Sequence, residues 1–187
     1  MAHRVCPWWL GYLLASPLRR MMQDPAKVVA PHVAEGMTVL EPGPGMGFFT
    51  LELARRVGAT GRVVAIDIQP RMLSSLKRRA VRTGLSDRVI TRVATAAGLG
   101  ITDLAGSVDF TLAFALVHEL PSPEAFFKEV ASASKAQAGL LFAEPSGHVK
   151  PEQFETELRA AIDAGFELVS RPTISRSRAA FLRMRPQ

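Results

Sequence analysis

The 187-residue chain is long enough to bury the core of one domain, and its composition is that of an ordinary soluble globular protein, with 48% hydrophobic and 21% charged residues. The formal net charge of +6 suits an anionic partner, but such a charge is also common on enzymes that never bind nucleic acid. The single cysteine, Cys6, excludes an intrachain disulfide framework and favours a reducing, cytoplasmic location. No run beyond the first residues is long and apolar enough to span a bilayer.

The first 35 residues are predicted to form a helical segment over the active site. Asp24-Pro25 marks a helix start, because aspartate caps free amide groups and proline fits the first turn. Residues 5–14 superficially resemble a short signal sequence, but they include a proline and two adjacent tryptophans and lead to no clear small-residue cleavage site. We therefore interpret them as part of the mature fold.

Strands and helices alternate along the rest of the chain. The predicted strands lie at 38–41, 62–67, 88–93, within 108–117, and at 139–144, 166–170 and 179–184. The helices between them are expected at about 48–57, from 70 to a stop at Gly84, from 123, and from 151 to a stop at Gly165. This alternation predicts right-handed crossovers and a mainly parallel sheet covered on both faces. The last two strands have no helix between them and are expected to form a hairpin. Residues 1–187 are predicted to be a single domain.

A glycine-rich turn, Gly43-Pro44-Gly45-Met46-Gly47, follows the first predicted strand. Glycine lets the backbone approach a ligand closely, and the next helix supplies free amide groups at its start. A dinucleotide fingerprint would have its third glycine where this chain has Phe48, which argues against a nicotinamide cofactor. Glu41 lies at the end of the strand before the turn. Asp67 ends the next strand, 20 residues after Gly47, at the spacing of a ribose-binding carboxylate.

From Gly36 to the C-terminus the chain resembles the class I S-adenosylmethionine-dependent methyltransferases. The resemblance implies a Rossmann-like α/β three-layer sandwich, with a mainly parallel seven-stranded sheet, one antiparallel strand, helices on both faces, and S-adenosylmethionine as cofactor. It implies contacts to the methionine part from Gly43, Gly45 and Gly47, to the ammonium group from Glu41, to the ribose from Asp67, and to the adenine from Ile68. Many members have an aspartate after the third strand that binds the adenine amino group. Residues 93–97 contain no acid, so we expect Thr95 or a backbone group in its place.

The acceptor is expected beyond the fourth and fifth strands, where ligands collect in open parallel sheets. His118-Glu119 follows the fourth strand, and Glu144 and His148 follow the fifth, so two of the four histidines fall here. His118 is our candidate for a general base, which typically contributes about 10²–10⁴-fold. Glu119 or Glu144 would orient it, and His148 would line the same pocket. The alternative is that both histidines are polar loop residues satisfied by backbone groups.

The N-terminal pair His3 and Cys6 extends this hypothesis. Neutral imidazole and thiolate bind zinc and softer metals, so the pair together with His118 and His148 would suit a metal ion or a metalloid substrate. The same residues would also serve without metal, with His118 as base and Cys6 only packing. Our primary assignment includes no metal.

The sequence is compatible with three functions. A small-molecule methyltransferase is favoured, because no inserted substrate domain is evident. A nucleic-acid methyltransferase is the alternative: residues 40–53 resemble the ribosomal RNA adenine dimethyltransferases, but 116–119 lack the Asn-(Leu/Ile/Pro)-Pro-(Tyr/Phe) motif of those enzymes. The remaining support for this alternative is a basic helix face formed by Lys77, Arg78, Arg79 and Arg82. We interpret this face as a solvated surface. A non-catalytic cofactor-binding protein is disfavoured by the intact glycine turn. The sequence does not indicate the acceptor atom or the oligomeric state.

Overall fold

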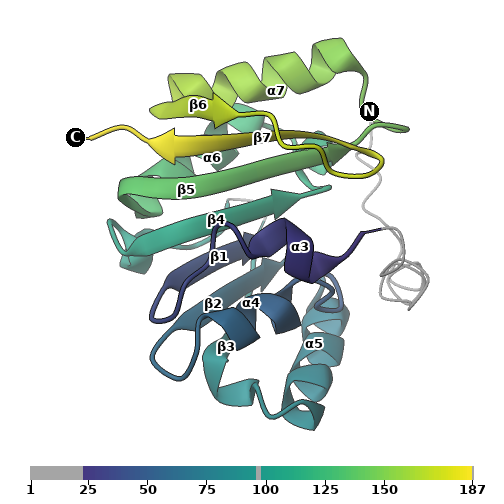
Figure 1. The fold of residues 1–187 in the computed structure, drawn as a ribbon, viewed down its shortest axis with the longest axis vertical. Helices are drawn as coiled ribbons and strands as arrows, with labels where there is room; N and C mark the ends of the chain where they lie inside the picture. The colour runs from purple at the N-terminus through teal and green to yellow at the C-terminus, as the bar shows by residue number, and fades with distance from the viewer. Residues whose placement is uncertain (1–22, 96–97, 187) are drawn as a thin grey trace. The chain divides into compact units, whose positions relative to one another are not determined.

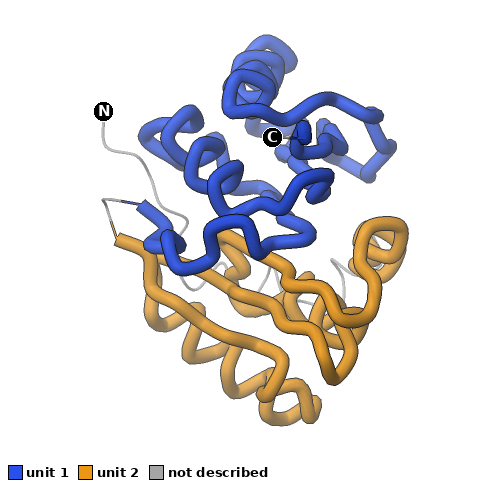
Figure 2. Tube along the Cα trace, turned by 90° about the vertical axis from the view of Figure 1, so that its left-hand side faces the viewer, with its two compact units in different colours: residues 1–4, 96–187 blue, residues 5–95 orange. Residues whose placement is uncertain are grey.

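The computed structural model describes residues 23–95 and 98–186. They fall into two compact units, which Figure 2 shows in different colours. We call residues 23–95 the N-terminal unit and residues 98–186 the C-terminal unit. The prediction of one domain over residues 1–187, with 1–35 above the active site, stays a prediction.

The N-terminal unit is a parallel three-stranded sheet with helices (Figure 1). Its elements are α3 (Pro25–Val29), β1 (Thr38–Pro42), α4 (Thr50–Arg56), β2 (Arg62–Asp67), α5 (Pro70–Arg82), a 3₁₀ turn (Ser86–Arg88) and β3 (Val89–Val93). Strand β2 lies between β1 and β3, with Glu41 paired to Ala65 and Asp67 paired to Val93. The carboxyl ends of β1 and β2 therefore lie at one edge, with both strand-end acids.

The C-terminal unit contains the other four strands and the helices α6 and α7 (Figure 1). Its elements are a 3₁₀ turn (Thr102–Leu104), β4 (Val108–Phe114), a second 3₁₀ turn (Val117–Glu119), α6 (Pro123–Ala133), β5 (Ser134–Pro145), α7 (Pro151–Asp163), β6 (Phe166–Ser170) and β7 (Ser177–Met184). Strands β4 and β5 are parallel, and β7 runs antiparallel to both β5 and β6. The predicted terminal hairpin is confirmed, and β7 is the predicted antiparallel strand.

Side-chain caps and prolines mark the starts of most helices. The Asp24 carboxylate accepts a hydrogen bond from the Ala26 amide (3.0 Å) at the start of α3. The Ser122 hydroxyl accepts one from the Ala125 amide (3.1 Å) at the start of α6. A proline occupies the first turn of α3, α5, α6 and α7, where its missing N–H costs nothing. These local signals fix where the helices begin.

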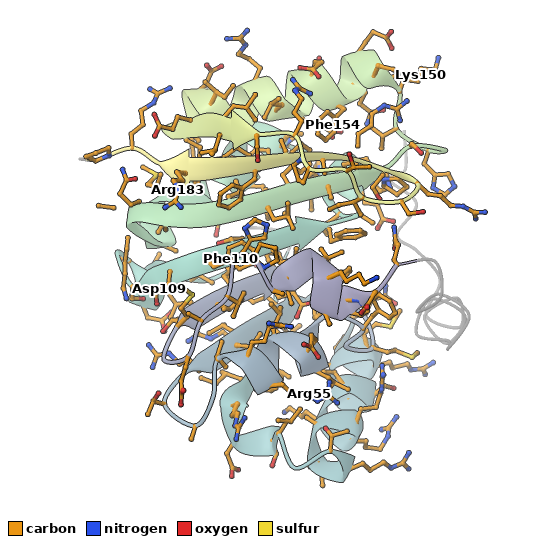
Figure 3. All side chains as sticks on the ribbon, viewed as in Figure 1. Arg55, Asp109, Phe110, Lys150, Phe154 and Arg183 are labelled. Carbon is orange, nitrogen blue, oxygen red and sulfur yellow. The ribbon has the colours of Figure 1, made fainter. Side chains whose placement is uncertain are left out.

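Each unit has its own apolar core. In the C-terminal unit the Phe142 and Phe154 rings stack with centroids 4.8 Å apart, and Phe127 meets Phe142 edge-on at 5.6 Å. Phe110 and Phe154, labelled in Figure 3, have almost no solvent exposure, and full burial of such a side chain stabilises the fold by about 1.5–3 kcal/mol. In the N-terminal unit the largest fully buried side chains are Leu40, Leu53, Ile66 and Leu76.

The ends of the strands are less well predicted than their positions. Strand β4 lies within the predicted range 108–117 and stops at Phe114, where the next residue, Ala115, adopts a left-handed backbone conformation (φ 54°). Strand β5 begins at Ser134, directly after α6, rather than at Gly139, and Gln137 within it also has a positive φ of 63°. Such an irregularity interrupts the side-chain alternation that reveals a strand. Within the described ranges, no helix has both the length and the hydropathy required to cross a membrane.

Candidate functional site

The glycine-rich turn leaves its backbone accessible. The Gly43 amide donates to the Ile66 carbonyl (2.8 Å), and the Gly47 amide donates to the Pro44 carbonyl (2.9 Å). Gly45 has a φ of +54°, and a β-carbon added there would meet no described atom within 4 Å. The space beside its α-carbon is therefore open to a ligand that approaches the backbone.

Helix α5 packs against the other side of this turn. A β-carbon on Gly47 would lie 2.4 Å from Cδ1 of Leu76, so the Leu76 side chain occupies that space. Nη1 of Arg79 donates to the Met46 carbonyl at 2.5 Å, and Arg79 is half-buried. The prediction that Arg79 lies on a solvated face of this helix is therefore wrong. The other three basic residues predicted on that face, Lys77, Arg78 and Arg82, are exposed.

Glu41 is a buried acid at the end of β1. The residue is only 3% exposed, and its Oε2 has no hydrogen-bond partner among the described residues. The pKa of this carboxyl is raised to about 8, mainly by burial and in smaller part by the negative charge of Asp67. The nearby Thr50 hydroxyl lowers the pKa in part, although Thr50 and Glu41 lack the geometry of a hydrogen bond. A positively charged ligand group would supply the missing partner.

The other predicted cofactor contacts lie near the ends of β2 and β3. Asp67 is half-buried, and its Oδ1 accepts a hydrogen bond from the Gln69 amide (2.8 Å). Its carbonyl accepts one from the Ala94 amide (3.1 Å), which brings the residues after β3 alongside. Ile68 is 50% exposed, as an apolar residue facing a ligand would be, and Thr95 is also exposed. Their contacts with a cofactor stay predictions.

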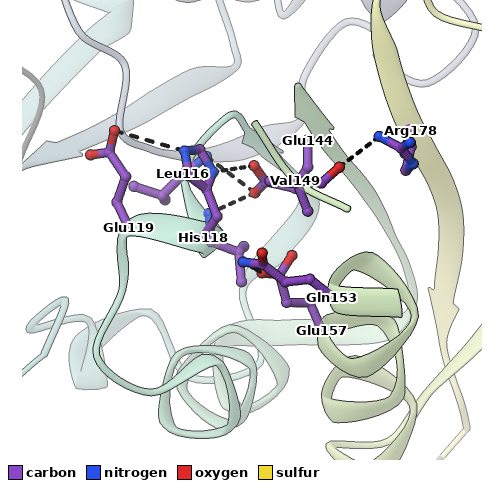
Figure 4. A network of polar contacts seen from close by, with 9 residues as sticks. Leu116, His118, Glu119, Glu144, Val149, Gln153, Glu157 and Arg178 are labelled. Atoms are coloured by element: carbon purple, nitrogen blue, oxygen red, sulfur yellow. Dashed lines mark hydrogen bonds and ion pairs between the residues drawn. The ribbon is translucent and has the colours of Figure 1, made fainter. Parts of the chain in front are cut away.

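In the C-terminal unit, Glu144 is the centre of a polar network (Figure 4). Its side chain is fully buried at the end of β5. Oε1 accepts hydrogen bonds from the backbone amides of Leu116 (3.2 Å) and Val117 (2.7 Å), and Oε2 is hydrogen-bonded to Nδ1 of His118. The two backbone donors satisfy a buried charge and fix the carboxylate that orients the imidazole.

Ala115 shapes the backbone for this network. Its left-handed conformation (φ 54°) bends the chain directly after β4, and its amide donates to the Ala143 carbonyl at 2.7 Å. The next two amides then point at Glu144. Non-glycine residues in such conformations cost about 1–3 kcal/mol each and cluster at active sites and ligand clamps. The bend is therefore consistent with a functional role for the residues that follow it.

His118 is more basic than a free histidine. Its hydrogen bond to Glu144 raises the pKa of the imidazole, partial burial opposes this effect, and the charges of Glu144, Glu119 and Glu157 raise the pKa further. Nε2 of His118 lies 4.0 Å from Oε1 of Glu119, beyond hydrogen-bonding distance, and 18% of the His118 side chain is exposed. The ring is thus held at one nitrogen and partly accessible to solvent.

Glu157 is a member of this cluster that the sequence prediction missed. It lies on α7, is 3% exposed, and accepts a hydrogen bond through Oε1 from Nε2 of Gln153 (2.9 Å). Its Oε2 has no partner among the described residues. Burial raises its pKa, the hydrogen bond from Gln153 opposes this effect, and the smaller contributions of Glu144 and His118 raise and lower it respectively. The sequence did contain a signal for the burial of this acid. Glu157 lies three residues after buried Phe154, and that spacing puts it on the apolar stripe of the helix.

The four predicted acceptor-side residues are only partly brought together. His118, Glu119 and Glu144 cluster (Figure 4), whereas His148 is exposed, and its backbone amide donates to the Pro145 carbonyl (3.1 Å). A pocket role for His148 stays a prediction. His3 and Cys6 lie outside the described residues. Within residues 23–95 and 98–186, no group of three or more histidine, cysteine, aspartate or glutamate side chains is placed to hold a metal ion.

Comparison with known proteins agrees with this geometry. A family model described as a methyltransferase domain matches residues 34–177, more than half of the chain. The structure is similar to that of an S-adenosylmethionine-dependent methyltransferase from Aquifex aeolicus, with a TM-score of 0.85 and 26% identity over 96% of this chain and 100% of the other. This likeness confirms the predicted Rossmann-like α/β fold.

Two further matches are more distant or shorter. A chain in the complex between the Haloferax volcanii Trm112 methyltransferase activator and the putative methyltransferase has a TM-score of 0.75 and 15% identity, over 95% of this chain and 96% of the other. A tRNA (adenine(57)-N(1)/adenine(58)-N(1))-methyltransferase of Methanocaldococcus jannaschii is 38% identical over 52 residues. That segment is 28% of this chain and only 18% of the relative.

Proposed function

Because this chain belongs to the methyltransferase domain family and uses S-adenosylmethionine, we propose that it methylates a small-molecule acceptor with His118 as the general base. The observation that supports this best is the His118–Glu144 pair, in which a fully buried carboxylate fixed by two backbone amides holds one imidazole nitrogen. A histidine that is only a polar loop residue does not need such a support.

The cofactor would lie on the turn of the N-terminal unit. When bound, S-adenosylmethionine supplies an electrophilic methyl carbon on a sulfonium. The Glu41 carboxylate, with its unpartnered buried oxygen, would bind the ammonium group, and the open side of Gly45 would admit the methionine part. Asp67 would accept hydrogen bonds from the ribose hydroxyls, and exposed Ile68 would lie against the adenine. The residues present fit the group that the family requires.

His118 would remove the proton of the acceptor. With Nδ1–H donated to Glu144, the neutral ring presents its lone pair on Nε2, because the hydrogen bond at one nitrogen sets the tautomer at the other. As Nε2 takes up the proton, the imidazolium gains a charge that buried Glu144 stabilises. Glu119, 4.0 Å from Nε2, would face the same acceptor group.

A small acceptor is favoured by the short connections around this pair. Within residues 98–186, only residues 115–122 follow β4 before α6, and only 146–150 follow β5 before α7. These segments offer few side chains with which to recognise a large substrate. The acceptor is therefore expected to be recognised mainly through its reactive group.

The test is a screen of thiols, phenols, amines and metalloid anions for cofactor-dependent product by mass spectrometry. On the acceptor found, His118→Ala should lower turnover by about 10²–10⁴-fold, the usual contribution of a positioned base, without weakening cofactor binding. Full turnover by His118→Ala would overturn the catalytic proposal.

An RNA acceptor is the second candidate, favoured by the local match to the tRNA methyltransferase. Helix α5 adds exposed Lys77, Arg78 and Arg82 and no acid, a charge pattern that suits phosphates. If RNA is the acceptor, changing all three to glutamine should reduce the slope of log K against log salt by about one for each phosphate that is no longer neutralised. No methyl incorporation into tRNA under conditions that methylate a small molecule would reject this candidate.

A further inference from the structure

Helix α5 contacts the glycine turn through two residues on one face. Leu76 and Arg79 are three positions apart, so they project from the same side of the helix. Leu76 is fully buried and fills the space where a Gly47 side chain would lie. Arg79 extends to the Met46 carbonyl, 33 residues earlier in the chain. A helix distant in sequence thus determines the surroundings of two successive turn residues.

The contact from Arg79 fixes one peptide plane of the turn. The Met46 carbonyl and the Gly47 amide belong to the same rigid peptide group. Arg79 donates to that carbonyl at 2.5 Å, and the amide donates to Pro44 at 2.9 Å. With both ends bonded, the plane cannot rotate without losing two hydrogen bonds. Its orientation also sets the left-handed φ of +85° at Gly47.

We propose that Arg79 is a positioning residue that holds the glycine turn in its cofactor-binding shape before the cofactor arrives. The proposal rests on the proposed function, in which the cofactor lies on this turn. A turn that populates its binding shape only part of the time binds more weakly by that fraction. Loss of a hydrogen bond from a charged donor commonly shifts such an equilibrium by about tenfold or more. Arg79 would act through the backbone and need not touch the cofactor.

The chain offers a matched control within the same unit. Nη1 of Arg88 donates to the Ala54 carbonyl (3.3 Å), 34 residues earlier in the chain, on α4 and away from the turn. Arg88→Met therefore removes a comparable arginine–carbonyl contact without touching the turn. Arg78→Met removes a charge from the exposed face of α5, where Arg78 bonds only to Ser75 among the contacts described (2.9 Å). It controls for the loss of charge alone.

The experiment compares full-length Arg79→Met, Arg88→Met and Arg78→Met by thermal unfolding without ligand and by calorimetry with S-adenosylmethionine and S-adenosylhomocysteine. We expect Arg79→Met to raise Kd for both ligands about tenfold or more, with a Tm no lower than that of Arg88→Met. Arg79→Lys, which keeps one donor, should recover part of the affinity. The Gly45 and Gly47 amide resonances should shift in ligand-free Arg79→Met.

The contrary results are equally specific. Unchanged Kd in Arg79→Met, or the same loss of affinity in Arg88→Met or Arg78→Met, would overturn the positioning role. If Arg79→Met does not fold, Arg79→Gln and Arg79→Lys take its place in the same comparison. Gly45→Val distinguishes failure of the positioning role of Arg79 from failure of the proposed cofactor site. A cofactor that does not lie on the turn would bind Gly45→Val with normal affinity.

Discussion

Cofactor affinity is expected to depend on the protonation of Glu41. Its pKa of about 8 in the ligand-free protein means that about nine-tenths of the molecules have a neutral Glu41 at pH 7. An ammonium group binds well to the ionised form, so the apparent Kd is the intrinsic Kd divided by the ionised fraction. That fraction is about 0.1 at pH 7 and about 0.01 at pH 6. Affinity should therefore weaken about tenfold per pH unit below pH 7.5.

Glu41→Gln is the perturbation that isolates this effect. The amide keeps the shape of the side chain and cannot ionise, so the steep pH dependence should disappear. The ammonium of the cofactor titrates near pH 8 as an α-amino group does, and the variant keeps that contribution. The difference between wild type and Glu41→Gln therefore reports Glu41 alone.

Calorimetry at pH 6.0, 6.75 and 7.5, in buffers of different ionisation enthalpy, measures both quantities. At pH 6.75 wild type should release about 0.9 proton per cofactor bound, since nearly every Glu41 must ionise and nearly every cofactor ammonium is already protonated, and Glu41→Gln should release close to none. A wild-type Kd that is flat over this range, or a variant with the same slope, would refute the reasoning.

Three other outcomes follow from the geometry. Gly45→Ala should lose cofactor affinity, and its left-handed backbone should lower the free energy of unfolding of the empty protein by about 1–2 kcal/mol. Gly47→Ala should lower that free energy more, because its β-carbon would lie 2.4 Å from a side-chain atom. Calorimetry measures the affinity and thermal unfolding the stability of both variants. Asp67→Ala should weaken cofactor binding by about 1.5–3 kcal/mol, and wild-type affinity would reject the ribose role. Glu144→Gln should lower kcat by up to about 10⁴-fold through the wrong tautomer. It should also move the acid limb of the kcat/KM profile to lower pH, because His118 must be neutral to act and its pKa is raised by Glu144; an unmoved limb would contradict this.

The sequence predicted most of the elements because their signals are local. Strand β2 spans Arg62–Asp67 as expected, and helices begin at the capping residues and prolines that marked them. The positive φ of Ala115, directly after β4, and of Gln137, within β5, could not be predicted, because neither residue type favours that conformation. The conformation of Ala115 accompanies a hydrogen bond from its amide to the Ala143 carbonyl on the neighbouring strand. No short window of sequence contains both residues.

Within the candidate site, the sequence identified acids and histidines at strand ends but missed polar residues on helices. Glu157 and Arg79 each belong to an amphipathic helix, where a charged residue is ordinarily assigned to the solvent face. Arg79 turns inward because a carbonyl of the glycine turn needs a donor. That requirement arises only once the turn and α5 are packed together.

The two buried strand-end acids differ in what the fold gives them. Glu144 receives two backbone amides and an imidazole, so its charge is satisfied before any ligand binds. Glu41 is almost as deeply buried but keeps an oxygen without a partner among the described residues, and its pKa is raised to about 8. Burying an ionised carboxylate in this way is unfavourable, so Glu41 is mostly protonated in the empty protein at pH 7, and a cationic partner would stabilise its ionised form. Glu144 is therefore a completed support for a neighbouring side chain, whereas Glu41 is an incomplete site whose missing partner is the ligand.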